Sequence, residues 1–217
     1  MLIFLRKFIF RILRPNIVFI TGNGRALAAE SILKVLQPYY KIKKLTNGKL
    51  PYFWSKKEIL LVEKDLAKNN NLKELKFLIQ KSRLPVFVVT NLGEIPSDKD
   101  YFEGEEEDTV LLKEIIKVLP LRGFLLLNYD DGLVRRLKNE TLANVFSFGF
   151  AEGANFRATD VNVDSNGINF KINYAGNIVP FWLDNSFGKE QVYGALAAAS
   201  ASVIKTLNLV EISQSLR

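Results

Sequence analysis

A glycine-rich turn, Gly22-Asn23-Gly24-Arg25-Ala26, lies between an apolar run and a helical pattern. Ile17–Ile20 is typical of a buried strand, and Ala26–Leu36 carries apolar residues at helical spacing. A strand, a glycine-rich turn and a helix in this order point backbone N–H groups and a helix N-terminus at a phosphate. The turn is therefore our first candidate for a nucleotide site.

The side chains of this turn differ from those of an intact phosphate-binding loop, G-x-x-x-x-G-K-[S/T]. Arg25 stands in the place of the lysine, and Ala26 in the place of the hydroxyl residue that binds magnesium. Arg25 can still pair with a phosphate, although its planar fork does not replace a compact ammonium group. The alternative is that Arg25 is an exposed cation in a remodelled turn.

The composition excludes several kinds of chemistry. The 217 residues include no Cys and no His, which excludes thiolate catalysis, disulfides, His-based triads and the usual zinc sites. A metal ion here would be a hard cation on oxygen ligands. The net charge of +7 suggests an anionic neighbour such as a nucleotide, a nucleic acid or a lipid surface.

Residues 1–14 form a basic, amphipathic segment that we expect to be a lead-in helix. Arg6, Lys7, Arg11 and Arg14 fall on one side of such a helix, and Leu5, Phe8, Ile9 and Ile12 fall on the other. The segment is shorter than the roughly 20 apolar residues that span a bilayer. It either lies on an anionic membrane or packs on the sheet of the domain itself.

Residues 15–217 are expected to form a single domain in which strands and helices alternate. Such alternation favours a parallel sheet covered by helices on both faces. The expected strands are Ile17–Ile20, Tyr39–Lys44, Ile59–Val62, Pro85–Thr90 and Gly123–Leu127. The expected helices are Ala26–Leu36, Leu72–Gln80, Thr109–Leu119 and Gln191–Leu207, with a turn at Asn47-Gly48 and an acidic loop at Glu103–Asp108.

Residues 155–185 change to strict alternation of apolar and polar residues. The runs Phe156–Val163, Ile168–Tyr174 and Ile178–Leu183 predict a three-stranded antiparallel meander. The predicted fold class is thus α/β: a mostly parallel, P-loop-type sheet covered by helices, with a small antiparallel meander near the C-terminus. Ligands of such sheets bind beyond the carboxyl ends of the strands, where Gly22, Glu63, Asn91 and Asn128 fall.

Six short motifs in a fixed order resemble the central, ATP-binding domain of the Mur ligases, and within them the MurF-like branch. They are Ile20-Thr21-Gly22-Asn23-Gly24-Arg25 (one residue shorter than the family's loop), Val88-Val89-Thr90-Asn91-Leu92-Gly93, Lys113-Glu114-Ile115, Leu127-Asn128-Tyr129-Asp130-Asp131, Phe148-Gly149 with Ala154–Ala158, and Gly188 with Ala195–Ala199. The resemblance covers roughly residues 15 to 216. It implies ATP and Mg²⁺ as candidate cofactors, which the altered loop could have lost.

The resemblance also suggests roles for single residues, each beside a plainer interpretation. Glu63 matches an acidic magnesium ligand or is a solvated glutamate. Lys113 matches an active-site lysine or is a surface lysine. Asn128 and Asp131 match a segment that contacts adenine and ribose, or they serve only to form a turn. Gly22, Asn23, Gly24 and Arg25 complete the candidate cofactor site.

The departures from the family pattern leave three functions open. The first is a Mur-ligase-like domain that is catalytically impaired alone, because Arg25 and Ala26 replace the loop's lysine and hydroxyl. The second is an ATP-dependent ligase subunit completed in trans by a protein partner that supplies the other ligase domains. The third is an adaptor held at a membrane surface by residues 1–14. Nucleic-acid binding is not favoured, because acids interrupt the Lys-rich stretch Lys41–Arg83. We expect a cytoplasmic protein, peripheral at the inner face of the membrane if the third function holds.

Overall fold

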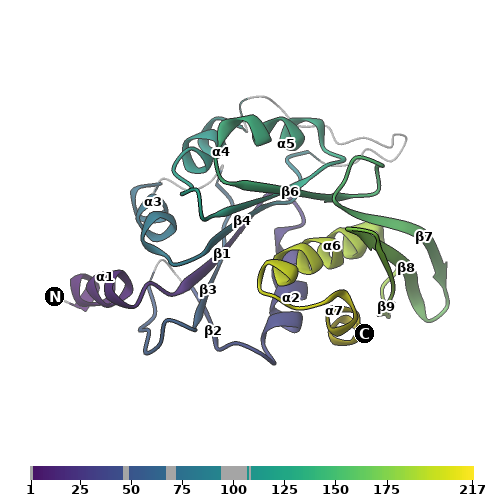
Figure 1. Cartoon of the computed structure of the whole chain (residues 1–217), viewed down its shortest axis with the longest axis horizontal. Coiled ribbons are helices and arrows are strands. Elements are labelled where there is room, and N and C mark those ends of the chain that lie inside the picture. Colours follow the sequence, from purple (N-terminus) through teal and green to yellow (C-terminus); the bar gives the residue numbers. More distant parts are fainter. Residues whose placement is uncertain (1, 46–48, 67–71, 94–106, 108) are drawn as a thin grey trace.

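The structure, a computed structural model, describes residues 2–45, 49–66, 72–93, 107 and 109–217. Its strands form a nine-stranded sheet in the order β2-β3-β1-β4-β5-β6-β7-β8-β9 (Figure 1). All pairs from β2 to β7 are parallel, and β7, β8 and β9 pair antiparallel. The strands are β1 Asn16–Thr21, β2 Ile42–Lys44, β3 Ile59–Glu63, β4 Pro85–Val89, β5 Phe124–Asn128, β6 Asn144–Gly149, β7 Phe156–Asp164, β8 Gly167–Tyr174 and β9 Asn177–Asp184.

Helices cover both faces of this sheet, and an apolar cluster on each face packs the helices against it. The helices are α1 Leu2–Leu13, α2 Arg25–Leu36, α3 Leu72–Lys81, α4 Thr109–Ile116, α5 Gly132–Arg136, the 3₁₀ helix η2 Leu137–Glu140, α6 Lys189–Ile204 and α7 Leu209–Leu216. One cluster joins α2, α6 and α7 to the sheet, and the other joins α1, α3, α4 and α5 to its opposite face (Figure 1). Because successive strand residues point to opposite faces, Val18 enters one cluster and Phe19 the other.

The predicted α/β class is confirmed, including the parallel sheet and the antiparallel meander. The central strands are buried along nearly their whole length, because helices cover both of their faces. The meander is not a separate appendage. Strand β7 pairs in parallel with β6, with Phe156 opposite Phe148, so β7, β8 and β9 extend the main sheet.

Four elements were not predicted from the sequence: β6, α5, η2 and α7. The helix expected at Thr109–Leu119 ends at Ile116, because the chain turns there toward Pro120. The strand expected at Tyr39–Lys44 is confined to Ile42–Lys44. The predicted turn at Asn47-Gly48 and, apart from Glu107, the predicted loop at Glu103–Asp108 lie outside the described residues.

Helix α1 packs on the domain through a side that the amphipathic pattern did not indicate. Phe10 is fully buried and contacts Phe53 and Phe77 edge-on or tilted, with ring centroids 5.6 and 6.2 Å away. Arg6 donates to the Leu50 carbonyl oxygen at 3.0 Å, and Lys7 lies 3.7 Å from the Glu74 carboxylate. Among the described residues, no helix is both long enough and apolar enough to cross a membrane.

Candidate nucleotide site

The candidate site lies at one edge of the sheet, where β1, β3, β4 and β5 end. Parallel pairing places Ile20 of β1 beside Glu63 of β3, so the turn after β1 meets the acidic end of β3. On the other side, Asn23 forms an isolated bridge with Asn91, which follows β4. The structure thus brings together the turn, Glu63 and Asn91 from separate parts of the sequence.

Two glycines give the turn its shape. Gly22 has φ 101° and Gly24 has φ 74°, both in the left-handed region that favours glycine. A Cβ atom on Gly22 would lie 2.6 Å from the Asn91 carbonyl oxygen and 2.6 Å from the Thr90 hydroxyl. Any side chain at position 22 would therefore push the turn away from the end of β4.

The turn is held against the end of β4 by backbone and side-chain hydrogen bonds. The Asn23 N–H donates to the Asn91 carbonyl at 2.7 Å, and the Asn23 amide donates to the Leu92 carbonyl at 2.9 Å. The Thr90 hydroxyl donates to the backbone oxygens of Thr21 and Asn23. A phosphate-binding loop offers such N–H groups to its ligand. Here the Asn23 N–H is already used within the protein.

Arg25 begins α2 and folds back over the turn. Its guanidinium donates to the Gly22 carbonyl at 3.0 Å and lies 4.0 Å from the Glu63 carboxylate and 3.6 Å from the Asp65 carboxylate. The Glu63 side chain is 43% exposed, so this ion pair adds little stability. It nevertheless places a fixed positive charge beside the carboxylate that was predicted to bind magnesium.

The residues at this edge do not fit a magnesium ion on their own. Magnesium prefers an octahedral set of oxygen ligands. Ala26 supplies no side-chain oxygen, and Arg25 lies beside Glu63. Within the part of the chain that the structure describes, no group of three Asp or Glu residues could hold a metal ion. Glu63 as a magnesium ligand stays a prediction.

Asn128, at the end of β5, is fully buried. Its side-chain oxygen accepts from the Asp130 N–H at 3.1 Å, and its side-chain amide nitrogen has no hydrogen-bond partner among the described residues. A buried donor without a partner is costly, so it marks a place where a ligand acceptor would be favourable. The predicted adenine contact of Asn128 is compatible with this feature and stays a prediction.

Asp131 has a structural role in the fold. One oxygen caps α5 by accepting from the N–H groups of Leu133 and Val134, at 2.9 and 3.1 Å. The other accepts from the Leu92 N–H at 2.8 Å, which ties the segment after β4 to α5. Asp131 is 2% exposed. The predicted ribose contact is untested, and the buried carboxylate already has three donors.

Asp130 is the residue at this edge that sequence reasoning missed. Its carboxylate accepts from the Phe150 N–H at 2.7 Å, the Ala151 N–H at 3.0 Å and the Tyr193 hydroxyl at 2.8 Å. It therefore ties the end of β5 to the segment after β6 and to α6. Burial, followed by the charge of Asp130, raises the pKa of Tyr193 well above its ordinary value. The sequence signal for it was its place in the motif Leu127–Asp131, directly before the aspartate that caps α5.

A cavity of about 400 Å³ lies beside this edge, next to the ends of β5 and β6. Tyr129, Arg135, Ser147 and Asn155 are among its lining residues, and the Arg135 guanidinium lies 5.0 Å from the centre of the Tyr129 ring. A planar, anion-bearing ligand suits such walls, because arginine and tyrosine offer charge and a ring face together.

Lys113 lies on α4, in the helix layer that covers one face of the sheet. Its side chain is half-buried, and its neighbour Glu114 pairs with Lys76 of α3 at 2.9 Å. No interaction between described residues connects Lys113 with the turn at Gly22–Arg25. The structure therefore does not bring Lys113 to the other candidate residues, and its catalytic role stays a prediction.

Comparison with known proteins gives a consistent relationship. The model of the Mur ligase middle domain matches residues 63–202. A UDP-N-acetylmuramate–L-alanine ligase of Alkaliphilus metalliredigens is 26% identical over 128 residues, which are 58% of this chain and 27% of the relative. One from Xanthomonas campestris pv. campestris is 33% identical over 118 residues, which are 52% of this chain and 24% of the relative.

Solved structures agree on the fold. MurF from Acinetobacter baumannii superposes with a TM-score of 0.76 at 16% identity, covering 97% of this chain and 46% of that one. MurF from Thermotoga maritima, solved in complex with ADP, gives a TM-score of 0.74 at 14% identity, covering 98% and 51%. A pseudomurein peptide ligase type C from Methanothermus fervidus gives 0.68 at 20% identity, covering 94% and 49%.

The chain spans about a quarter of the length of the curated relatives and about half of these solved structures. Because the family model matches residues 63–202, well over half of the chain, this protein belongs to the Mur ligase family through its middle domain.

Proposed function

We propose that this chain is a Mur ligase middle domain that is catalytically impaired alone and binds ATP or another nucleotide weakly or not at all. It is related to ligases that add amino acids or a dipeptide to peptidoglycan precursors. Its turn lacks the lysine and the hydroxyl residue of an intact phosphate-binding loop.

The observation that carries this proposal is the position of Arg25. A lysine at this place can extend toward the outer phosphates as a point charge. Arg25 instead bonds to the Gly22 carbonyl and pairs with Glu63 and Asp65. A magnesium ion at Glu63 would have to displace a guanidinium, and Ala26 would offer it no replacement oxygen. The chain's own residues therefore occupy the phosphate end of the site with an internal ion pair.

The residues at the end of β5, where the adenine contact was predicted, support weak nucleotide binding. MurF from Thermotoga maritima holds ADP, and it shares this fold. In this chain the Asn128 amide, which has no partner in the described part of the chain, and the walls of the cavity that Tyr129 lines lie at the end of β5. They could favour a base and its sugar, whereas Arg25 weakens magnesium-assisted phosphate binding.

Release of inorganic phosphate from ATP tests catalytic impairment. With magnesium, the chain alone should release phosphate no faster than its Glu63→Ala variant. Release that needs Glu63 would contradict the proposal. Release that needs Glu63 only after the other ligase domains are added as separate chains would support the alternative, a ligase subunit completed in trans.

A second candidate function is attachment to an anionic membrane surface through α1. Phe4, Phe8 and Ile12 are 78%, 52% and 62% exposed and recur at the four-residue spacing of one helix face. Arg11 and Arg14 are exposed, and the sequence of α1 contains no acid. An apolar face beside cations is typical of a helix that lies in the interface of an anionic bilayer.

Sedimentation with phospholipid vesicles tests this second function. The chain should sediment with anionic vesicles and much less with zwitterionic ones, and Phe8→Glu together with Ile12→Glu should abolish it. Leu142→Glu is the matched control, since Leu142 is 86% exposed outside α1. Equal sedimentation of the α1 variant and the control would exclude membrane attachment through α1.

A further inference from the structure

A second cavity lies at the opposite edge of the sheet, where the parallel strands begin. It has a volume of about 1040 Å³ and opens to solvent. Asn16, which starts β1, and Leu84, which directly precedes β4, both line it. The candidate nucleotide residues lie at the other ends of these strands, so the two sites are separated by the length of the sheet.

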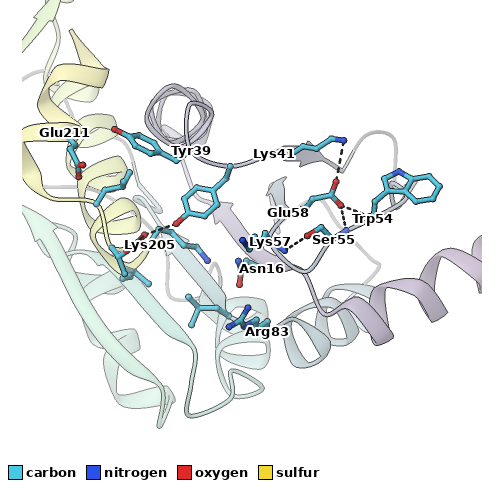
Figure 2. A pocket seen from close by; sticks show the side chains of 15 residues that line it. Asn16, Tyr39, Lys41, Trp54, Ser55, Lys57, Glu58, Arg83, Lys205 and Glu211 are labelled. Carbon is cyan, nitrogen blue, oxygen red and sulfur yellow. Dashed lines mark hydrogen bonds and ion pairs between the residues drawn. The ribbon is translucent and has the colours of Figure 1, made fainter.

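Lys205 is the unusual residue of this cavity. It follows the last residue of α6, and its own carbonyl accepts from the Tyr40 hydroxyl at 3.0 Å. The residue is 4% exposed, and its Nζ has no hydrogen-bond partner among the described residues. Tyr40 and Asn16 line the cavity with it, and Figure 2 shows Lys205 and Asn16 in this lining. An ammonium group in this position is costly unless an anion joins it.

The acidic residues of the cavity do not provide that anion. Glu58 pairs with Lys41 at 3.7 Å and accepts from the Trp54 N–H at 2.8 Å (Figure 2), and it also pairs with Lys43 at 3.2 Å. Glu211, at the start of α7, accepts from the Asn208 N–H at 2.9 Å in a capping box. Both carboxylates therefore have partners other than Lys205.

Two further cations line the same cavity. Arg83, between α3 and β4, and Lys57, before β3, make no ion pair with the described residues. Burial, followed by the charge of Arg83, lowers the pKa of Lys205 to about 7. With Lys41 already paired to Glu58, the charge that faces Lys205 from its neighbouring elements is positive.

We propose that this cavity is a binding site for a ligand with an oxyanion group, phosphate or carboxylate, that pairs with Lys205 and Arg83. A metal ion is disfavoured by Lys205, Arg83 and Lys57, which make no ion pair with any residue that the structure describes. Oxyanions accept several N–H bonds at once, which an ammonium and a guanidinium can donate together. The volume exceeds that of a bare anion, and the exposed rings of Tyr39 and Trp54 lie at two sides of the opening, where they can contact an organic part (Figure 2).

Sulfate and acetate are suitable probes, because sulfate represents a phosphate ester and acetate a carboxylate. Binding is followed through the backbone amide signals of Thr206 and Leu207 in ¹H–¹⁵N spectra, at constant ionic strength set with chloride. Only the protonated amine pairs with the anion, so affinity should fall by about tenfold from pH 6 to pH 8. Stronger sulfate binding would indicate a phosphate ligand, and stronger acetate binding a carboxylate ligand.

Variants separate this site from unspecific attraction. Lys205→Met and Arg83→Gln should each weaken binding by about tenfold or more, whereas Lys205→Arg should bind without the pH dependence. Lys73→Met is the control, because Lys73 is exposed on α3; it should bind as the unchanged protein does. Equal affinity of the unchanged protein at pH 6 and pH 8, or equal weakening by Lys73→Met, would overturn the proposal. The unchanged protein suffices for the first comparison even if a variant fails to fold.

Discussion

At the scale of single residues, one substitution changes the chemistry of the candidate nucleotide site. Lysine and arginine carry the same charge, but the arginine fork bonds to carbonyl and carboxylate groups in its own neighbourhood. Arg25 does so with Gly22, Glu63 and Asp65. The sequence could show the substitution. It could not show the pairing, which depends on β1 and β3 being neighbours in the sheet.

Asp130 lies in a turn, but its three hydrogen bonds should contribute strongly to the free energy of unfolding. Asp130→Ala removes an acceptor from Phe150, Ala151 and Tyr193 and should lower the free energy of unfolding by about 2–4 kcal/mol. Urea unfolding measures this change. Glu152→Ala, a side chain 88% exposed in an ion pair with Arg157, is the control and should change it by less than about 0.5 kcal/mol. Similar losses in both variants would contradict the role of Asp130.

Lys205 should make stability depend on pH. Its pKa is lowered to about 7, so between pH 7 and 9 the unfolded chain holds a proton that the folded chain has released. Stability therefore rises with pH in this window, by up to about 3 kcal/mol over two pH units. Tyr193, whose pKa is raised, acts in the opposite direction only above about pH 10.

Urea unfolding of the protein at pH 7 and at pH 9, without oxyanions, measures this effect. Lys205→Met should lose most of the pH dependence, because the side chain no longer binds a proton. If the free energy of unfolding changed with pH as much in Lys205→Met as in the unchanged protein, groups other than Lys205 would cause the pH dependence.

At the scale of elements, the clearest sequence patterns predicted the strands correctly. β4 reads Pro-Val-Phe-Val-Val and is buried throughout, because a strand covered on both faces needs continuous apolar residues. The meander alternates because parts of it face solvent. These patterns are local, and a reader of the sequence can recognise them without knowing the partners.

The elements that escaped prediction are those that depend on partners. β6 reads Asn-Val-Phe-Ser-Phe-Gly and is only partly buried, so its position is fixed by pairing with β5 and β7 rather than by its own pattern. α5 has five residues and depends on the Asp131 cap. In α1, Arg6 and Lys7 bond to the domain while Phe4 and Phe8 are exposed, which reverses the side that the amphipathic pattern suggested for packing.

The contact between α2 and α6 depends on small residues. A Cβ atom on Gly194 would lie 3.2 Å from the Ser31 hydroxyl and 3.3 Å from the Leu27 carbonyl group, so the helices can approach only as closely as glycine allows. Gly194→Val should therefore lower the free energy of unfolding by about 1–3 kcal/mol. The measurement is urea unfolding.

Gly132→Ala is the matched control for this contact. Gly132 lies in α5, and a Cβ atom there would have no neighbour within 4 Å. Alanine should raise stability by about 0.5–1 kcal/mol through its better helix propensity. Equal effects at both positions would contradict close packing of α2 against α6.

At the scale of the whole molecule, the sheet has two different edges. The edge with the Gly22 turn carries the candidate nucleotide residues and an internal ion pair at Arg25. The other edge carries an open cavity with a buried lysine that has no partner among the described residues. A middle domain of the Mur ligase family thus keeps its fold, and both of our binding proposals rest on the charged side chains at these two edges.

The magnesium dependence of ATP binding tests the central claim most directly. In a calorimetric titration of the unchanged chain, we expect no binding below about millimolar ATP and no gain when magnesium is added, because Ala26 offers magnesium no side-chain oxygen and the Arg25 guanidinium lies 4.0 Å from the Glu63 carboxylate. Arg25→Lys combined with Ala26→Thr should bind magnesium-ATP more tightly than the unchanged chain. Micromolar, magnesium-dependent binding by the unchanged chain that Glu63→Ala abolishes would contradict the account.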